Sequence, residues 1–507
     1  MKALITVTLL FITSTIFGQN IENASDLKLA DIMKGNAFIG YQPEDIRWSL
    51  DGKKIIFEWN PNNEVGSSTY AYNTSTKTID SLTPNFYTDN ASFYGDQKYD
   101  IEFFTRNGVL YQYDRKTRAV QLVFSTADPI GNVQRSEQLH KIYFQTGTNL
   151  YSYDQNSHAI KQLIRFKKGE RPSDEKKLNH WEQEELDLFQ YHKDQKEKNK
   201  WKDQQDELWN DQLRTIYYKQ ASVSNIQISK DERYITFRVN AIPDVRSTHV
   251  EHHISSDGHS TISKARAKVS ENDPNHKLGI YDLKRDSVYY ADFSTLSEVR
   301  TKPAYYKIYG DDETHFDKDR NIIMHRLKFS DDGLQNVLDV RSHDNKDRWI
   351  ISVDLASGQI QELEHQHDEA WIGGPGISGW NMSEGTLGWL RDNKTFFFQS
   401  EESGYSHLYS FNIDTQKKNT LTSGNWEIHS AELNAKGDIL FVTANKTHPG
   451  NRGFYHLKLK DNTLLPILTS DGNYEVEVSP DENYLAIRYS TKTQPWKLFI
   501  AQNKSGA

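Results

Sequence analysis

The chain has 507 residues, a hydrophobic share of 36%, an aromatic share of 12% and a formal net charge of −9. This length favours a repeat architecture over one ordinary compact domain, and the acidic balance argues against nucleic acid, since phosphate binding needs a basic surface. No cysteine is present, which excludes disulfides, thiolate zinc sites and a cysteine nucleophile.

The first 18 residues have the pattern of a secretory signal peptide. Lys2 precedes the apolar run "ALITVTLLFITSTIF", and the small residue Gly18 stands before Gln19 at a suitable cleavage point. A membrane anchor is the alternative, but about 15 apolar residues fall short of a bilayer span. No later segment is apolar enough to cross a membrane. We therefore expect a periplasmic or secreted protein whose mature chain begins with a lead-in segment over residues 19–45.

From residue 46 to residue 500 one pattern recurs about eight times. Each unit has a polar turn with Asp, Gly or Asn, followed by a strand rich in Ile, Phe and Tyr. The strands end at Trp59, Phe104, Phe144, Val239, Val340, Phe398, Val442 and Tyr489. Most units continue into a second hairpin, as in "LYQYDRKTRAVQLV" and "LYSFNIDTQKKNTL".

Units of roughly 40 to 55 residues with four strands each are typical of a β-propeller, in which neighbouring blades bury each other's faces. The fold class predicted is all-β, an eight-bladed β-propeller. A row of separate β-sandwiches is the alternative, but no Pro- or Ser-rich linker divides the chain.

Two segments interrupt the repeats. Residues 173–213 lack Gly and are rich in Glu, Lys and Gln, which predicts a long helix or helical hairpin inserted between blades three and four. Residues 246–276 are polar and rich in His, which predicts a long excursion from a blade.

Three groups of residues are candidates for ion or phosphate sites. His249, Glu251 and His253 would share one face of a strand, and His365 and His367 have the same spacing, but exposed loop histidines explain both groups, so no metal site is predicted. The glycines of "WIGGPG" follow no strand-then-helix unit. We interpret that segment as a turn beside a blade and predict no cofactor.

The ordered blade motifs resemble the N-terminal domain of the dipeptidyl peptidase IV branch of the prolyl oligopeptidase family. They are "WSLDGKKIIF", "WIGGPG", "FFFQSEESGYSHLYSFN", "LTSGNWEI", "HPGNRGFYHL" and "VSPDENYLAIRY". The resemblance covers about residues 27–500. It implies an eight-bladed propeller that caps an α/β-hydrolase peptidase domain, with a peptide as substrate.

The chain departs from this family in its chemistry. The family's Ser nucleophile lies on a Gly-x-Ser-x-Gly elbow after the propeller, and this sequence contains no such motif. No catalytic residue is therefore predicted. The last predicted blade ends near residue 500 and a tail of residues 501–507 follows. We expect a truncated form of a longer exported serine peptidase, in which the propeller gates and positions substrate for a C-terminal hydrolase domain of the same parent chain.

A stand-alone periplasmic propeller that binds a protein, peptide or glycan is the alternative function, and a homodimer stays open. The resemblance also implies a substrate anchor, because dipeptidyl peptidases of this family hold the substrate's amino terminus with two Glu after a Trp. Glu184 and Glu185 follow Trp181 at that spacing. The alternative interpretation is that Glu184 and Glu185 simply lie on the solvent-exposed face of a helix.

Overall fold

The structure is a computed structural model. It describes residues 28–82, 100–136, 140–170, 190–209, 213–241, 247–266, 275–304, 318–379 and 383–504.

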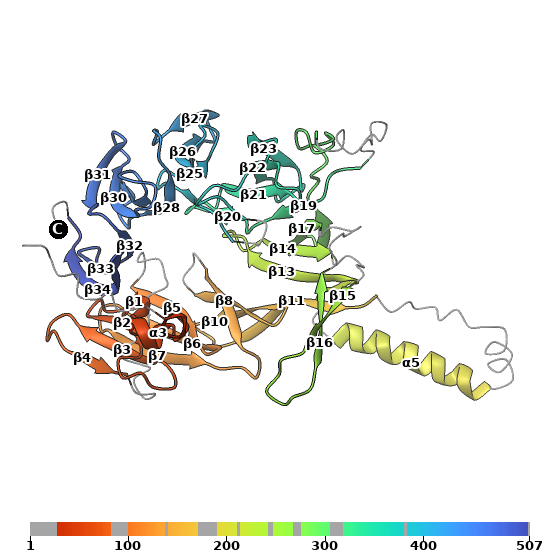
Figure 1. The fold of residues 1–507 in the computed structure, drawn as a ribbon. Coiled ribbons are helices and arrows are strands. Elements are labelled where there is room, and N and C mark those ends of the chain that lie inside the picture. The colour runs from red at the N-terminus through yellow and green to blue at the C-terminus, as the bar shows by residue number, and fades with distance from the viewer. Residues whose placement is uncertain are drawn as a thin grey trace, which may run out of the picture.

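In the described part of the chain, eight sheets follow one another and form a ring, antiparallel throughout except for the pair β11–β12, so the predicted eight-bladed β-propeller is confirmed (Figure 1). The first four blades are built as follows. Blade one has β1 (Glu44–Trp48), β2 (Lys54–Trp59), β3 (Ser68–Asn73) and β4 (Ile79–Ser81); blade two has β5 (Ile101–Arg106), β6 (Val109–Asp114) and β7 (Ala119–Phe124); blade three has β8 (Ile130–Arg135), β9 (Lys141–Thr146), β10 (Asn149–Asp154), β11 (Ile160–Lys168) and β12 (Thr215–Tyr218); blade four has β13 (Ala221–Ile228), β14 (Tyr234–Ala241), β17 (His276–Asp282) and β18 (Ser287–Tyr290).

The second half of the ring repeats the plan. Blade five has β19 (Ile322–Met324), β20 (Lys328–Phe329), β21 (Asn336–Ser342), β22 (Asp347–Val353) and β23 (Ile360–His367); blade six has β24 (Leu387–Trp389), β25 (Thr395–Ser400), β26 (His407–Asn412) and β27 (Lys417–Thr420); blade seven has β28 (Ile428–Leu433), β29 (Ile439–Ala444), β30 (Gly453–Lys458) and β31 (Thr463–Leu468); blade eight has β32 (Asn473–Val478), β33 (Tyr484–Thr491) and β34 (Gln494–Gln502).

Three further pieces lie outside the blades. The lead-in has two short helices, α2 (Leu29–Ile32) and α3 (Asn36–Ile39). A two-stranded hairpin of β15 (Ser247–His252) and β16 (Thr261–Arg266) projects from blade four, within the predicted polar excursion. The helix α5 (Gln190–Trp209) extends away from the ring between β11 and β12 (Figure 1).

Helix α5 falls inside the segment predicted to be helical. The chain returns from it to pair β12 with β11 in parallel, so the helix interrupts blade three rather than separating blades three and four. Residues 171–189 and 210–212 lie outside the described residues. The full extent of the predicted helical insertion therefore stays a prediction.

The repeated Ser-x-Asp pattern of the sequence builds the turn between the first two strands of a blade. In blade one the Ser49 hydroxyl donates to Asp51 Oδ1 (2.7 Å) and accepts from the Lys54 amide (2.9 Å), while Gly52 has a φ of +70°. These side-chain bonds fix the turn locally. The same arrangement recurs in blades four, five and eight at Ser229–Asp231, Ser330–Asp332 and Ser479–Asp481.

The core is divided among the blade boundaries. Among the described residues, each of the eight boundaries holds its own apolar cluster, so every blade buries both faces against its neighbours. The cluster between blades four and five contains fifteen buried residues. The cluster between blades eight and one contains four, and the one between blades one and two contains two. Blade one therefore has the fewest buried apolar residues at its two boundaries.

Polar side chains bond across several boundaries as well. Arg326 of blade five donates to Asn132 Oδ1 of blade three (2.9 Å) and to Gln227 Oε1 of blade four (2.8 Å). Gln399 of blade six donates to the carbonyl of Ile428 in blade seven (2.8 Å). These bonds set how neighbouring blades sit against each other without an exchange of strands.

We predict that Trp48→Phe lowers the free energy of unfolding by about 2 kcal/mol, because it removes a buried indole hydrogen bond and leaves a small void. Trp48 is 3% exposed, and its Nε1 donates to the Glu477 carbonyl of blade eight (2.9 Å). Denaturant unfolding measures the loss. Trp201→Phe is the matched control, because Trp201 on α5 is 64% exposed and its replacement is expected to change stability by less than about 0.5 kcal/mol. Equal effects of the two substitutions would contradict the role of Trp48 in closing the ring.

Candidate functional site at the junction of the first and last blades

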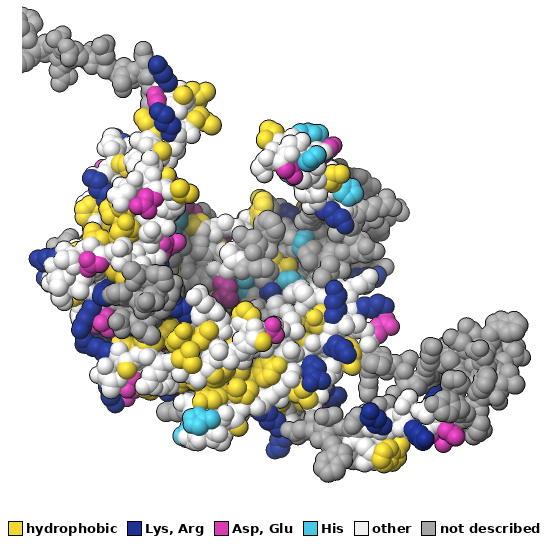
Figure 2. All heavy atoms as spheres, turned by 90° about the horizontal axis from the view of Figure 1, so that it is seen from below, with side chains coloured by type: hydrophobic (Ala, Val, Ile, Leu, Met, Phe, Trp, Pro, Cys, Tyr) yellow, Lys and Arg dark blue, Asp and Glu magenta, His cyan; other side chains and the backbone are white. Residues whose placement is uncertain are grey.

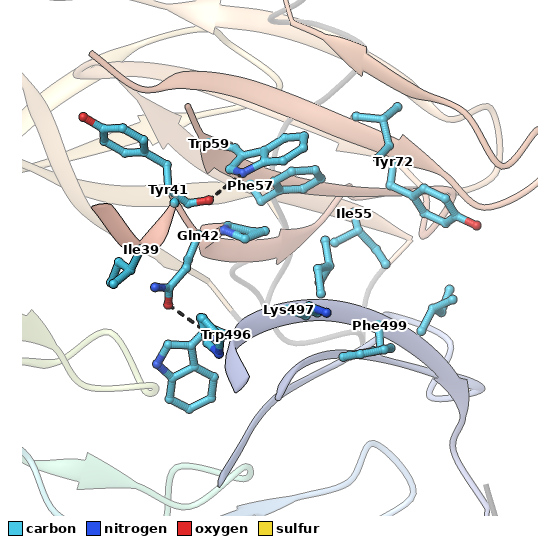
Figure 3. Close-up of a pocket in the computed structure, with 16 residues that line it drawn as sticks. Ile39, Tyr41, Gln42, Ile55, Phe57, Trp59, Tyr72, Trp496, Lys497 and Phe499 are labelled. Carbon is cyan, nitrogen blue, oxygen red and sulfur yellow. Dashed lines mark hydrogen bonds between the residues drawn. The ribbon is translucent and has the colours of Figure 1, made fainter. Parts of the chain in front are cut away.

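The ring closes where blade one meets blade eight, and the lead-in joins both of them. Tyr41 accepts a hydrogen bond through its carbonyl from Trp59 Nε1 of blade one (3.0 Å). Gln42 accepts through Oε1 from the amide of Trp496 on β34 (3.2 Å). Figure 3 shows both bonds, with the lead-in between strands from opposite ends of the described chain. The first and last parts of the propeller thus meet at one place.

A pocket of about 690 Å³ lies between these strands (Figure 3). Its walls are mostly aromatic and aliphatic side chains from the lead-in, from blade one and from β34, and Lys497 is the one charged side chain among its lining residues. The lining includes Ile39, Tyr41, Phe57, Trp59, Tyr72, Trp496, Leu498 and Phe499.

Large apolar side chains continue from this pocket onto the surface. Neither α2 nor α3 contains a buried residue, and Leu29 and Met33 are 73% and 77% exposed. Figure 2 shows hydrophobic side chains gathered on this projecting lead-in at upper left, with the His-bearing β15–β16 hairpin at upper right of the same face. We call the pocket and the two lead-in helices together the junction surface. Exposed apolar side chains gathered in one place are common at contact surfaces of proteins.

Acidic side chains lie on the first strands of blades seven and eight. Burial away from water, together with the negative charges of Glu432 and Glu475, raises the pKa of Glu477 on β32 to about 7. Burial and the charge of Glu482 raise the pKa of Glu432 on β28. This pair therefore holds a proton more readily than ordinary carboxylates do.

Basic side chains lie on the side of the ring formed by blades four and five. Burial lowers the pKa of Arg238 and of Arg326, and Arg238 donates to the carbonyl of Met324 (2.6 Å). Burial, with the charges of Arg238 and His325, lowers the pKa of His276 to about 4. Sequence reasoning missed these buried basic groups, because nothing in their local spacing separates them from ordinary strand residues.

The residues proposed from the sequence as a substrate anchor are not placed by the structure. Glu184 and Glu185 lie outside the described residues, as does Trp181. Their role therefore stays a prediction.

The first His group does not gather into a site. His249 and Glu251 lie on β15 and His253 follows it, and the nearest approach between ring and carboxylate is 3.9 Å from His253 Nδ1 to Glu251 Oε1. All three residues are exposed. The interpretation as exposed histidines fits their placement, although two of the three positions are in a strand and not in a loop.

The interpretation of His365 and His367 as exposed loop histidines was wrong. His365 and His367 are not in a loop but on β23, and both rings lie against the carboxylate of Asp347 on β22. The period-two spacing puts both rings on one face, and the sheet register supplies the acidic partner, which the local sequence does not reveal.

The glycine-rich segment is a turn between β23 and β24, as predicted. The amide of Gly373 donates to Glu401 Oε1 (3.0 Å), the amide of Ile377 donates to the carbonyl of Gly374 (3.2 Å), and Gly376 has a φ of +70°.

A family model described as the dipeptidyl peptidase IV (DPP IV) N-terminal region matches residues 224–496, more than half of the chain. The chain belongs to this family. The family resemblance drawn from the blade motifs is therefore confirmed.

Curated DPP IV-like relatives match a shorter segment. "Probable dipeptidyl-aminopeptidase B" of Coccidioides posadasii (strain C735) is 25% identical over an alignment of 187 residues. The match covers 31% of this chain and 20% of that protein. Dipeptidyl peptidase 4 of Felis catus is 27% identical over 165 residues, again 31% of this chain and 20% of the relative.

A solved structure of Porphyromonas gingivalis dipeptidyl peptidase 4 matches the fold with a TM-score of 0.55 at 13% sequence identity. The match covers 95% of this chain and 62% of that protein. The chain therefore spans less than two thirds of the length of these DPP IV-like relatives. Of the helices described, none has the length and apolarity that crossing a bilayer would need.

We predict that Glu477→Gln stabilises the propeller at pH 8 and has little effect at pH 5. The pKa of Glu477 is about 7 in the fold against an ordinary value of 4.5, so the folded state binds the proton more tightly. Its stabilising contribution is full below pH 4.5 and is lost as the pH rises through 7. The neutral amide removes this loss.

Thermal unfolding of both proteins between pH 5 and pH 8 measures the difference. Glu64→Gln, at an exposed position after β2, is the matched control and is expected to follow the wild-type curve. A Glu477→Gln curve parallel to that of the wild type would contradict the raised pKa.

Proposed function

We propose that this chain is the substrate-gating and positioning propeller of an exported DPP IV-like serine peptidase. In this proposal an α/β-hydrolase domain of the same parent chain docks on the junction surface and carries the nucleophile. The observation that carries the proposal is the apolar junction surface at the point where both ends of the ring meet.

The composition of the junction surface supports a protein partner. Ile32, Met33 and Phe38 of the lead-in are 53%, 77% and 47% exposed, and Phe499 of β34 is 46% exposed. A soluble monomer rarely keeps so much contiguous apolar area in water. A domain that continues from β34 would reach this surface without a long linker, because β34 itself lines the pocket.

The ring supports a gating role. Its blades are tied by apolar clusters and cross-boundary hydrogen bonds, so it acts as a rigid frame with acidic groups on blades seven and eight and basic groups on blades four and five. A frame of this kind admits narrow chains and orients their charged ends, and orientation lowers the barrier of the chemical step.

The paired carboxylates of Glu184 and Glu185 are proposed to hold the free amino terminus of the peptide. Two carboxylates neutralise an ammonium group and fix its position through charge-assisted hydrogen bonds. Export through a signal peptide over residues 1–18, and a homodimer as the working form, are parts of the same proposal.

The reaction chemistry is assigned to the hydrolase domain. A serine peptidase needs a nucleophile, a base and oxyanion donors within reach of one carbonyl. The 507 residues contain no Gly-x-Ser-x-Gly elbow and no cysteine. The propeller would thus bind and position the substrate without cleaving it.

We predict that the purified chain cleaves no amino-terminal dipeptide reporter and takes no label from a serine-directed covalent probe. The same assay on the product of the coding sequence extended downstream of residue 507 is expected to give turnover and stoichiometric labelling. Turnover by the 507-residue chain alone would overturn the division of roles. An extended product without a hydrolase domain would favour a binding propeller instead.

In the active extended protein, replacing Glu184 and Glu185 together by Gln is expected to remove the preference for free amino termini. Glu197→Gln is the matched control, because Glu197 is an exposed residue of α5. An unchanged preference in the double variant would contradict the anchor and leave the gating proposal standing.

A further inference from the structure

A cluster of His and carboxylate side chains lies on the outer strands of blade five, away from the junction surface. Asp347 opens β22 and pairs in register with His367 on the neighbouring strand β23, and His365 lies two residues before it on the same face. Antiparallel pairing thus brings three potential metal ligands together from two adjacent strands.

The two imidazole rings converge on a single oxygen. His365 Nε2 lies 2.9 Å and His367 Nδ1 lies 2.7 Å from Oδ1 of Asp347. The other oxygen, Oδ2, accepts from Arg320 (2.5 Å). The side chain of Asp347 is 1% exposed, whereas that of His367 is 35% exposed. The cluster therefore has a buried floor and an open side.

A fourth ligand comes from the loop before β19. Glu298 Oε2 lies 4.0 Å from His367 Nδ1, and ligand atoms of Glu298, Asp347 and His365 all lie within 4.8 Å of one another. The side chain of Glu298 is 49% exposed, so it can rotate toward the other three ligands.

The surroundings of the cluster hold it in this geometry. His365 stacks on Trp349 with ring centroids 5.5 Å apart and an angle of 8° between the planes. Trp349 Nε1 donates to the carbonyl of Ser297 (3.0 Å), and the Ser297 hydroxyl donates to Glu362 (2.7 Å). The loop that carries Glu298 is thus fastened to the same two strands as the other ligands.

The local charge favours a cation. Four carboxylates and two cationic side chains lie in or beside the cluster. The carboxylates belong to Glu298, Asp344, Asp347 and Glu369, and the cations to Arg320 and Lys346.

We propose that Asp347, His365, His367 and Glu298 bind one divalent transition-metal ion of the zinc class. Two imidazole nitrogens and two carboxylate oxygens are a ligand set that suits zinc or cobalt, whereas calcium and magnesium prefer oxygen ligands alone. Neighbouring ligands of a tetrahedral zinc lie about 3.4 Å apart, given metal–ligand distances of about 2.0–2.1 Å. The groups are not at that spacing in the structure: both imidazole nitrogens lie closer than about 3.4 Å to Asp347 Oδ1, and Glu298 Oε2 lies 4.0 Å from His367 Nδ1. A bound ion would therefore have to separate the first groups and draw in Glu298.

The ion would add a further link between the loop that carries Glu298 and the outer strands of blade five, beside the hydrogen bonds of Ser297. Arg320 on the far oxygen of Asp347 then orients that ligand, as hydrogen-bonded carboxylates around metal centres commonly are oriented. Three of the ligands sit on the fourth strand of the blade and its neighbour and the fourth in a loop, so we assign the ion a structural role.

The test is metal binding by the full chain after treatment with a chelator. Titration with Co²⁺ is expected to give the visible absorption bands of four-coordinate cobalt at one equivalent. Calorimetry with Zn²⁺ is expected to give the same stoichiometry, and Zn²⁺ is expected to raise the unfolding temperature while Ca²⁺ does not. His365→Gln and His367→Gln are each expected to weaken Zn²⁺ binding at least tenfold.

His249→Gln with His253→Gln is the matched control, because these histidines are exposed on the hairpin of blade four; it is expected to keep wild-type affinity. If the ligand variants fold poorly, Glu298→Gln at the exposed ligand still tests the site and is expected to weaken binding with an unchanged circular dichroism spectrum. Wild-type protein without saturable binding, or binding that survives in the His365 and His367 variants, would overturn the proposal.

Discussion

Closure of the ring depends on a small contact between blades that are far apart in the sequence. Among the described residues, no strand of blade eight pairs with blade one. The two are held together by four buried residues with partly buried side chains around them, by the hydrogen bond from Trp48 to the Glu477 carbonyl, and by the lead-in that bonds to both. The boundary between blades four and five buries fifteen. Since a propeller has no free faces only when its ring is closed, the other seven boundaries rely on this one to keep their curvature.

The same place carries a group of exposed apolar side chains. The lead-in is hydrogen-bonded to both sides of the closure through Tyr41 and Gln42, yet its helices contain no buried residue. A partner that covered Met33 and Phe38 would bury apolar area and would also clamp blades one and eight. Docking of a domain and stability of the ring would then be coupled, which gives a physical reason for a propeller to share a chain with its enzyme.

The fold was largely predictable because its signals are local. A Ser-x-Asp turn such as Ser49–Asp51 fixes its own geometry through side-chain hydrogen bonds within five residues. Each further copy of this turn in the sequence therefore indicates the first hairpin of another blade. The sites were less predictable because their signals are not local. The spacing of His365 and His367 was visible, but Asp347 is brought to them by sheet register and Glu298 by a loop. The raised pKa of Glu477 likewise depends on burial in the fold and on the charge of Glu432 of another blade.

The central claim is that a downstream domain docks on the junction surface. Hydrogen exchange on the extended protein tests it most directly, because it measures the protection of backbone amides at that surface. The account predicts that amides of residues 29–43 and 494–500 exchange more slowly when the downstream domain is present than in the 507-residue chain, with blades four and five unchanged. Equal exchange at these residues in an extended protein that cleaves peptides would contradict docking on the junction surface.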